Sequence, residues 1–81
     1  MTMTTPTLPL DPDGMNYDRA EMARDALQHF GLENNLDSED LLADLLTNLM
    51  HWCDRSPLVF ADELTRAQRN YRSETTPEGT L

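Results

Sequence analysis

The 81-residue sequence contains no lysine, one cysteine and only five aromatic residues. A single cysteine excludes an internal disulfide and a multi-cysteine zinc site, and is typical of proteins of a reducing compartment. No apolar run approaches the ~18–20 residues of a membrane-spanning helix, and the N-terminal MTMTTPTLPL lacks the features of a signal peptide. We therefore expect a cytoplasmic protein with one small domain, a size that favours a binding module over a deep catalytic cleft.

The charge is one-sided. Fifteen Asp and Glu residues oppose six arginines, and the net charge is −9. Between Asp25 and Asp54 there are seven carboxylates and no arginine. Such a field repels nucleic acid and anionic membranes and attracts basic surfaces. The simplest interpretation is a solvated surface that keeps a small protein soluble. The more specific interpretation, which the density of the block favours, is a surface for a basic partner.

Three segments have helical periodicity, at about residues 16–30, 38–55 and 59–73, and no segment alternates as a strand does. The third has a narrow apolar seam with spacings of 4, 3 and 4, formed by Phe60, Leu64, Ala67 and Tyr71. The predicted fold is all-α, a compact three-helix domain over residues 13–73. A flexible Thr/Pro arm (1–12) and a flexible tail (74–81) flank it.

Local signals predict where these helices begin and end. Gly31 occupies the position where a left-handed residue closes the first helix. Asp37 is the expected N-cap of the second helix, with Leu36 and Leu41 at the spacing of a hydrophobic staple. The second helix should end by Ser56, because the residue before a proline avoids helical angles.

The second helix is unusually apolar. Its apolar residues span about half of its circumference, and they are Leu41, Leu42, Leu45, Leu46, Leu49, Met50, Trp52 and Cys53. A helix of this kind needs neighbours on two sides, so we expect it to be the central element, with its apolar half, Cys53 included, turned inward.

The same helix carries the residues that would be considered first for a metal site or a catalytic site. His51 and Cys53 are two positions apart, about 200° around a helix, so they cannot clasp one metal ion or form a nucleophile–base pair. We expect Cys53 to be a small buried hydrophobe. No catalytic residue, metal or cofactor is predicted.

Asp37-Ser38 at the start of a leucine-rich helix resembles acyl carrier proteins, whose serine bears phosphopantetheine. That resemblance implies a modified Ser38. However, the carriers have leucine after the serine, where this sequence has Glu39, and their long first loop is missing. Ser38 as an ordinary first-turn residue is the preferred interpretation.

Arginines 66, 69 and 72 form a stripe on the third helix, which raises the alternative of a helix-turn-helix DNA reader. The net charge of −9 opposes this alternative. No cluster of base-reading side chains begins that helix. Direct binding of nucleic acid is therefore not expected.

The acidic face of the second helix is the remaining candidate site. Asp40 and Asp44 are one helical turn apart, ~5–6 Å along the axis, which is comparable to the phosphate spacing of a nucleic-acid strand. A groove lined by Lys and Arg could hold such a face through charge-assisted contacts. We predict a partner-binding site made of Glu33, Asp37, Glu39, Asp40, Asp44 and Asp54, in an inhibitor that acts without chemistry.

Residues 45–74, LLTNLMHWCDRSPLVFADELTRAQRNYRSE, resemble small helical proteins of proteobacterial phages and plasmids. The matching features are the leucines ahead of His51-Trp52, then Asp54, Phe60 and the Ala67–Tyr71 spacing. Ser56-Pro57 replaces the usual glycine-containing turn. The resemblance brings no catalytic residues; it implies origin in a mobile element, where acidic proteins often counter host defences. The expected partner is then a basic nucleic-acid-binding complex, such as a CRISPR effector, blocked in the manner of an anti-CRISPR protein.

A second hypothesis belongs to another class of protein. The apolar half of the second helix can exceed what two short neighbours cover. A dimeric regulatory or antitoxin-type interaction protein would use that surface for pairing. Both a monomer and a homodimer are compatible with the sequence.

Overall fold

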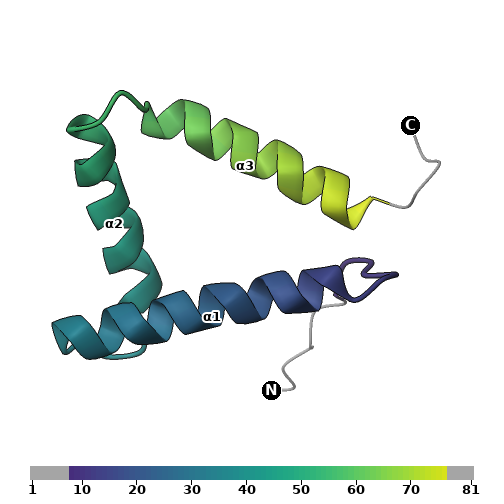
Figure 1. The fold of residues 1–81 in the computed structure, drawn as a ribbon, viewed down its shortest axis with the longest axis horizontal. Coiled ribbons are helices and arrows are strands. Elements are labelled where there is room, and N and C mark those ends of the chain that lie inside the picture. Colours follow the sequence, from purple (N-terminus) through teal and green to yellow (C-terminus); the bar gives the residue numbers. More distant parts are fainter. Residues whose placement is uncertain (1–7, 77–81) are drawn as a thin grey trace, which may run out of the picture.

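The computed structural model describes residues 8–76, which form three helices and no strand: α1 (Met15–Asn34), α2 (Leu41–Asp54) and α3 (Phe60–Thr75). The predicted all-α, three-helix fold is confirmed. The helices follow three sides of a frame: α2 connects one end of α1 to one end of α3, and the far ends of α1 and α3 approach each other (Figure 1). Within the described residues, no helix combines the length and the apolar character needed to cross a bilayer. Most of the predicted arm (1–7) and tail (77–81) lies outside the described residues.

Asp11 caps the start of α1. Its two carboxylate oxygens accept hydrogen bonds from the backbone amides of Asn16 (2.8 Å) and Tyr17 (3.0 Å). These amides belong to the first turn, which has no intrahelical acceptor for them. Gly14, just before the helix, is left-handed with φ 74°, and this lets the chain fold back so that Asp11 reaches the helix end. Asp11 belongs to the segment predicted as an arm, yet it is hydrogen-bonded to the helical domain.

The end of α1 differs from the prediction. The helix does not close at Gly31 but continues to Asn34, and Asn35 is the left-handed cap (φ 53°), with its amide donating to the carbonyl of Gly31. Gly31 is buried inside the helix, and a Cβ there would lie 2.5 Å from Cδ2 of Leu41. The glycine therefore permits close packing of α2 on α1 rather than a left-handed backbone.

The start of α2 was also predicted wrongly. Asp37 is not the N-cap: residues 38–40 form a turn, in which the amide of Asp40 donates to the carbonyl of Asp37 (3.1 Å). The helix begins at Leu41, and Asp40 occupies the cap position without a side-chain hydrogen bond. Because the longer α1 must be followed by a reversal before Leu41 can reach Gly31, the residues expected in the first turn are used by the connection.

The α2–α3 connection follows the prediction closely. Helix α2 ends at Asp54, before Ser56 and Pro57. The hydroxyl of Ser56 donates to the carbonyl of Cys53 (3.1 Å) and accepts from the amide of Leu58 (3.1 Å). Val59 is extended and α3 begins at Phe60. Pro57 thus lies at the corner between α2 and α3, and the Ser56 hydroxyl stabilises this corner through its two hydrogen bonds.

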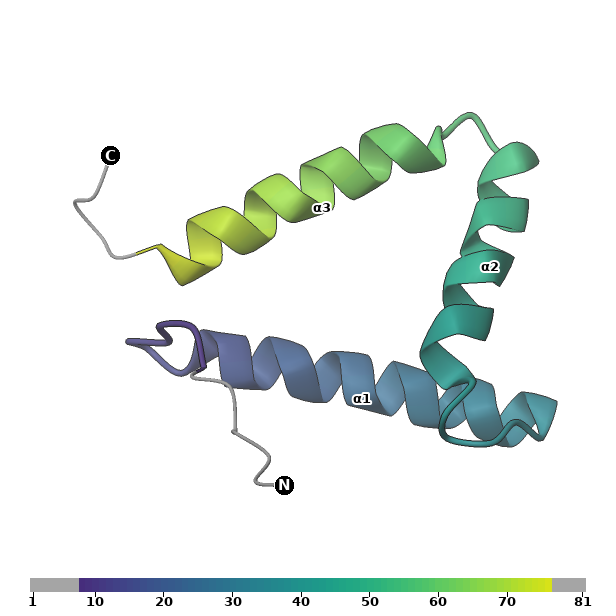
Figure 2. The same cartoon turned by 180° about the vertical axis from the view of Figure 1, so that it is seen from behind.

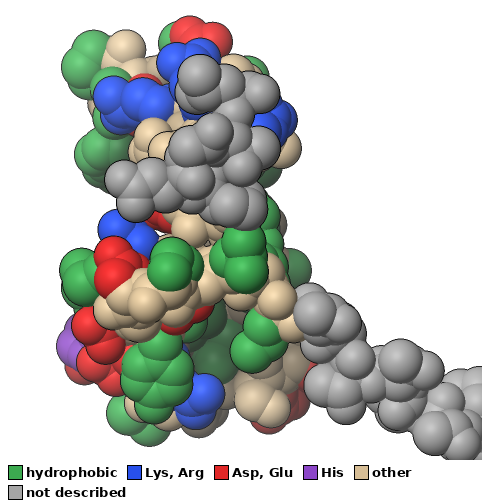
Figure 3. All heavy atoms as spheres, turned by 90° about the vertical axis from the view of Figure 1, so that its right-hand side faces the viewer, with side chains coloured by type: hydrophobic (Ala, Val, Ile, Leu, Met, Phe, Trp, Pro, Cys, Tyr) green, Lys and Arg blue, Asp and Glu red, His purple; other side chains and the backbone are tan. Residues whose placement is uncertain are grey.

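The core is minimal. Cys53, 8% exposed, is the one apolar side chain that is buried within residues 8–76, besides the helical Gly31. The apolar half of α2 is therefore not turned inward as expected: Leu42, Leu46, Leu49, Met50 and Trp52 are 41–60% exposed. The Cα radius of gyration is 15.7 Å, against about 11–12 Å for a typical domain of this length. Figure 3 shows hydrophobic side chains exposed on one face of the molecule.

The far ends of α1 and α3 are joined by a small polar network. The side-chain amide of Asn16 donates to the carbonyls of Glu74 (2.8 Å) and Leu10 (3.2 Å). Arg19 forms an ion pair with the Glu74 carboxylate (3.3 Å) and donates to the side-chain oxygen of Asn16 (2.6 Å). Glu74, predicted to begin the tail, thus closes the frame at the side opposite α2 (Figure 2).

Candidate acidic docking surface

The predicted site residues are concentrated where α1 turns into α2. Glu33 lies in the last turn of α1, and Asp37, Glu39 and Asp40 lie in the connection. Asp44 lies in the first turn of α2 and is half-buried, whereas the others are exposed. We call this set the acidic corner: Glu33, Asp37, Glu39, Asp40 and Asp44. Asp54 is at the other end of α2, about 15 Å further along the helix axis than Asp44, and is not part of the corner.

The tightest group in the corner comes from the turn. Carboxylate oxygens of Asp37, Glu39 and Asp40 lie within 4.8 Å of one another. In water, two such charges repel by roughly 1 kcal/mol before salt screening. The geometry therefore differs from the one-turn spacing of a helix face: it is a compact patch of negative charge, whose repulsion a cationic partner relieves.

Three exposed carboxylates are hard oxygen ligands of the kind that Ca²⁺ and Mg²⁺ accept. Ca²⁺ takes six to eight such ligands and Mg²⁺ six. The turn supplies one oxygen from each of Asp37, Glu39 and Asp40, all exposed to solvent, so water would have to complete the shell. The arrangement suits a cationic side chain at least as well as a metal ion.

The protein's own arginines pair elsewhere. The ion pairs within residues 8–76 are Arg19–Glu74, Arg24–Glu21 and Arg66–Glu63. None of them involves a residue of the acidic corner or Asp54. Eleven carboxylates and two arginines precede Arg55, whereas three carboxylates and four arginines lie between Arg55 and Thr76. The negative charge is thus concentrated before Arg55, on α1, α2 and the segments that precede them, and α3 is close to neutral.

His51 and Cys53 lie in different surroundings on α2. Cys53 is buried, whereas His51 is exposed on α2 and its backbone carbonyl accepts from the Arg55 guanidinium (3.0 Å). Ser38 is exposed in the turn before α2, so it is not the first residue inside the helix. It lines a shallow hollow of about 420 Å³ together with Gly31 and Leu41.

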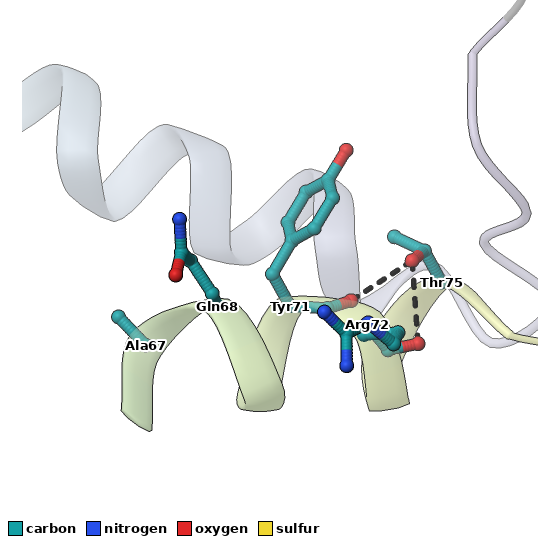
Figure 4. Close-up of a pocket in the computed structure, with 5 residues that line it drawn as sticks. All are labelled: Ala67, Gln68, Tyr71, Arg72 and Thr75. Atoms are coloured by element: carbon teal, nitrogen blue, oxygen red, sulfur yellow. Dashed lines mark hydrogen bonds between the residues drawn. The ribbon is translucent and has the colours of Figure 1, made fainter. Parts of the chain in front are cut away.

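Two hollows on α3 were missed by the sequence analysis. One, of about 480 Å³, lies between α1 and α3 and is largely apolar, with Leu8, Tyr17 and Tyr71 in its lining. The other, of about 560 Å³, runs along α3 past Ala67, Tyr71 and Thr75, and the Tyr71 ring extends from α3 beside the neighbouring helix (Figure 4). The missed signal for the first hollow is Leu8-Pro9, shortly before the Asp11 cap, which the composition assigned to the arm.

Comparison with known proteins finds no similar family, protein or fold: no family model, no curated protein and no solved structure matches this chain.

Proposed function

We propose that this protein is a non-enzymatic binding protein that docks its acidic corner onto a basic surface of another macromolecule. The observation that carries the proposal is the cluster of Asp37, Glu39 and Asp40. Their carboxylates are exposed, lie within 4.8 Å of one another, and form no ion pair with an arginine of residues 8–76. A partner's guanidinium groups gain charge-assisted, bidentate contacts there and remove the mutual repulsion.

The partner class follows from the same chemistry. A surface that offers several Lys or Arg side chains within a few ångströms is one that holds phosphate groups. Occupation of such a surface by the acidic corner excludes nucleic acid, so inhibition needs no catalytic residue. The mobile-element resemblance of residues 45–74 points to a host defence complex, such as a CRISPR effector, as the target.

Competition tests the proposal. The protein is added to a defence complex with labelled nucleic acid, and bound nucleic acid is measured by fluorescence anisotropy. Bound nucleic acid should fall as the protein is added, and the effect should weaken between 50 and 500 mM salt, because the contacts are between charges. Undiminished nucleic-acid binding across a panel of such complexes contradicts the proposed function.

Matched charge variants assign the effect to the corner. Asp37→Asn, Glu39→Gln and Asp40→Asn together remove three negative charges from the cluster. Asp18→Asn, Asp25→Asn and Asp62→Asn remove the same charge from exposed carboxylates without side-chain hydrogen bonds or ion pairs in the described residues. The corner variant should lose more than about tenfold in potency, since each lost charged contact is worth on the order of 1 kcal/mol. Equal losses in both variants would assign the effect to net charge alone.

A further inference from the structure

We propose that a second copy of this chain covers the exposed apolar surface of α2 and α3. The surface, called here the α2–α3 face, consists of Leu42, Leu46, Leu49, Met50, Leu64 and Tyr71, each 41–60% exposed. Four of these side chains are on α2, within about 100° of its circumference. Leu64 and Tyr71 belong to the 4–3–4 seam of α3. The result is a contiguous pattern on each helix, unlike the scattered single leucines of an ordinary surface.

The single chain lacks the burial that a stable fold needs. Ordering a residue costs on the order of 1–2 kcal/mol of conformational entropy, and burial of apolar side chains is the main opposing contribution. Within residues 8–76 only Cys53 among the apolar side chains is buried. Few contacts hold the three helices together: the burial of Cys53, the Gly31–Leu41 contact and the Asn16 network. The helices therefore need a further apolar surface packed against them.

The exposed area is of the size that a dimer interface uses. The chain exposes 7377 Å², whereas a folded monomer of 9.3 kDa exposes about 5000 Å². Deduction of the most that the twelve residues outside 8–76 could expose, about 1.45 Å² per dalton, leaves about 5500 Å², against about 4500 Å² for a folded monomer of the remaining mass. The excess is about 1000 Å². A standard interface buries about 800 Å² per partner. One copy therefore has enough surplus surface for one interface of ordinary size.

The pattern on the face suits a copy of itself. Leu42, Leu46 and Leu49 are spaced 4 and 3, and Leu64 and Tyr71 are seven residues apart, which is the period at which helices interlock side by side. In a twofold dimer each helix meets the same pattern on its partner. A second copy is also available wherever the chain is made, so it can supply the missing burial before any other macromolecule is met.

Charge favours the same pairing. Arg69 and Arg72 on α3 make no ion pair within residues 8–76. Residues 1–54 of the other copy carry eleven carboxylates and two arginines. An arrangement that brings α3 of each copy beside the acidic half of the other gains electrostatic attraction twice. Asp40 and Asp44 lie about 120° or more around α2 from Leu46 and Leu49, so packing of these leucines against the other copy leaves the two carboxylates uncovered.

The mass and the melting temperature of the full chain test the proposal. Sedimentation equilibrium should give twice the 9.3 kDa chain mass. The apparent Tm should rise by more than about 5 °C over a hundredfold increase in concentration, because dissociation accompanies unfolding. A helical monomer whose Tm is independent of concentration overturns the proposal. So does a chain that is unfolded alone, or one that forms only larger assemblies.

Variants locate the interface. Leu46→Glu with Leu49→Glu should abolish the dimer and its concentration-dependent Tm, whereas Leu32→Glu, at an 85%-exposed position outside the face, should preserve both. Because the double variant can lose its fold along with the dimer, Arg69→Glu with Arg72→Glu provides an independent measurement on exposed side chains. It should weaken the dimer at least about fivefold at low salt and much less at high salt. A dimer unaffected by the leucine changes overturns the assignment to the α2–α3 face.

Discussion

Gly31 decides how closely the first two helices approach. A Cβ at this position would lie 2.5 Å from one methyl group of Leu41, 3.5 Å from the other and 3.6 Å from its Cγ, so its three nearest neighbours are all atoms of this side chain. The obstacle is the flexible end of one side chain. Glycine inside a helix costs up to about 1 kcal/mol relative to alanine, so steric conflict and helix propensity oppose each other here.

We predict that Gly31→Ala changes the free energy of unfolding by less than about 1 kcal/mol, because the gain in helix propensity offsets the shift of Leu41. Gly31→Val adds a branched group that Leu41 cannot avoid and should destabilise by about 1–3 kcal/mol. Urea unfolding followed by circular dichroism measures both at one protein concentration. Equal stability of the Val variant and the natural chain would show that the α1–α2 contact is looser than the structure has it.

The same glycine explains why part of the helix boundaries escaped the sequence analysis. Gly31 is a standard signal for the end of a helix, and Asp37 is a standard signal for the start of one. The sequence analysis interpreted both residues in this way. A glycine that closes a helix and one that admits a neighbouring leucine look identical in sequence, because the second role depends on Leu41, ten residues away. Asn35, which does adopt the left-handed conformation, is the next best residue for it.

At the scale of the elements, local sequence signals predicted the helix boundaries where no contact with a residue distant in sequence competes with them. Pro57 and the Phe60–Tyr71 seam placed the end of α2 and the limits of α3 within two residues. Periodicity also assigned an apolar side to α2 and to α3. Whether a neighbour covers that side depends on the angles between helices: α1 crosses α2 near its start and α3 leaves from its end (Figure 1), and Leu42, Leu46 and Leu49 stay exposed. Burial was therefore not predictable from pattern alone.

The contact between α1 and α3 was also beyond the sequence analysis, because Asn16 and Glu74 are 58 residues apart. We predict that Asn16→Ala destabilises by about 1 kcal/mol, since it removes two hydrogen bonds to backbone carbonyls and one from Arg19, all partly solvent-exposed. The last turn of α3 should lose protection in amide hydrogen exchange.

Asn48→Ala is the matched control for that variant. Asn48 is exposed on α2, and its side chain makes no hydrogen bond within the described residues. The substitution should leave the exchange of the α3 amides unchanged. If both variants give the same exchange pattern, the Asn16 network does not hold the two helix ends together.

At the scale of the whole molecule, the predicted site residues are not equally close to one another. Composition alone indicated that negative charge would be concentrated before Arg55, and five of the six predicted residues lie in the last turn of α1, the connection and the first turn of α2. The close approach of Asp37, Glu39 and Asp40 arises from a turn where a helix was expected. Asp54 was grouped with them because it belongs to the same arginine-free stretch of sequence, yet it is the last residue of α2 and lies at the other end of that helix.

This charge distribution makes stability depend on salt. A net charge of −9 destabilises the folded chain through self-repulsion, and salt screens that repulsion. We predict that the Tm rises by several degrees between 20 and 500 mM NaCl at fixed protein concentration. The corner variant (Asp37→Asn, Glu39→Gln, Asp40→Asn) should melt higher than the natural chain at 20 mM and respond less to salt, because its lost charges lie within 4.8 Å of one another. The control with Asp18, Asp25 and Asp62 neutralised removes equal charge from separated sites, so its salt response should stay closer to that of the natural chain. A Tm that falls with NaCl, or an identical response in the two variants, would mean that repulsion at the corner does not limit the stability of the fold.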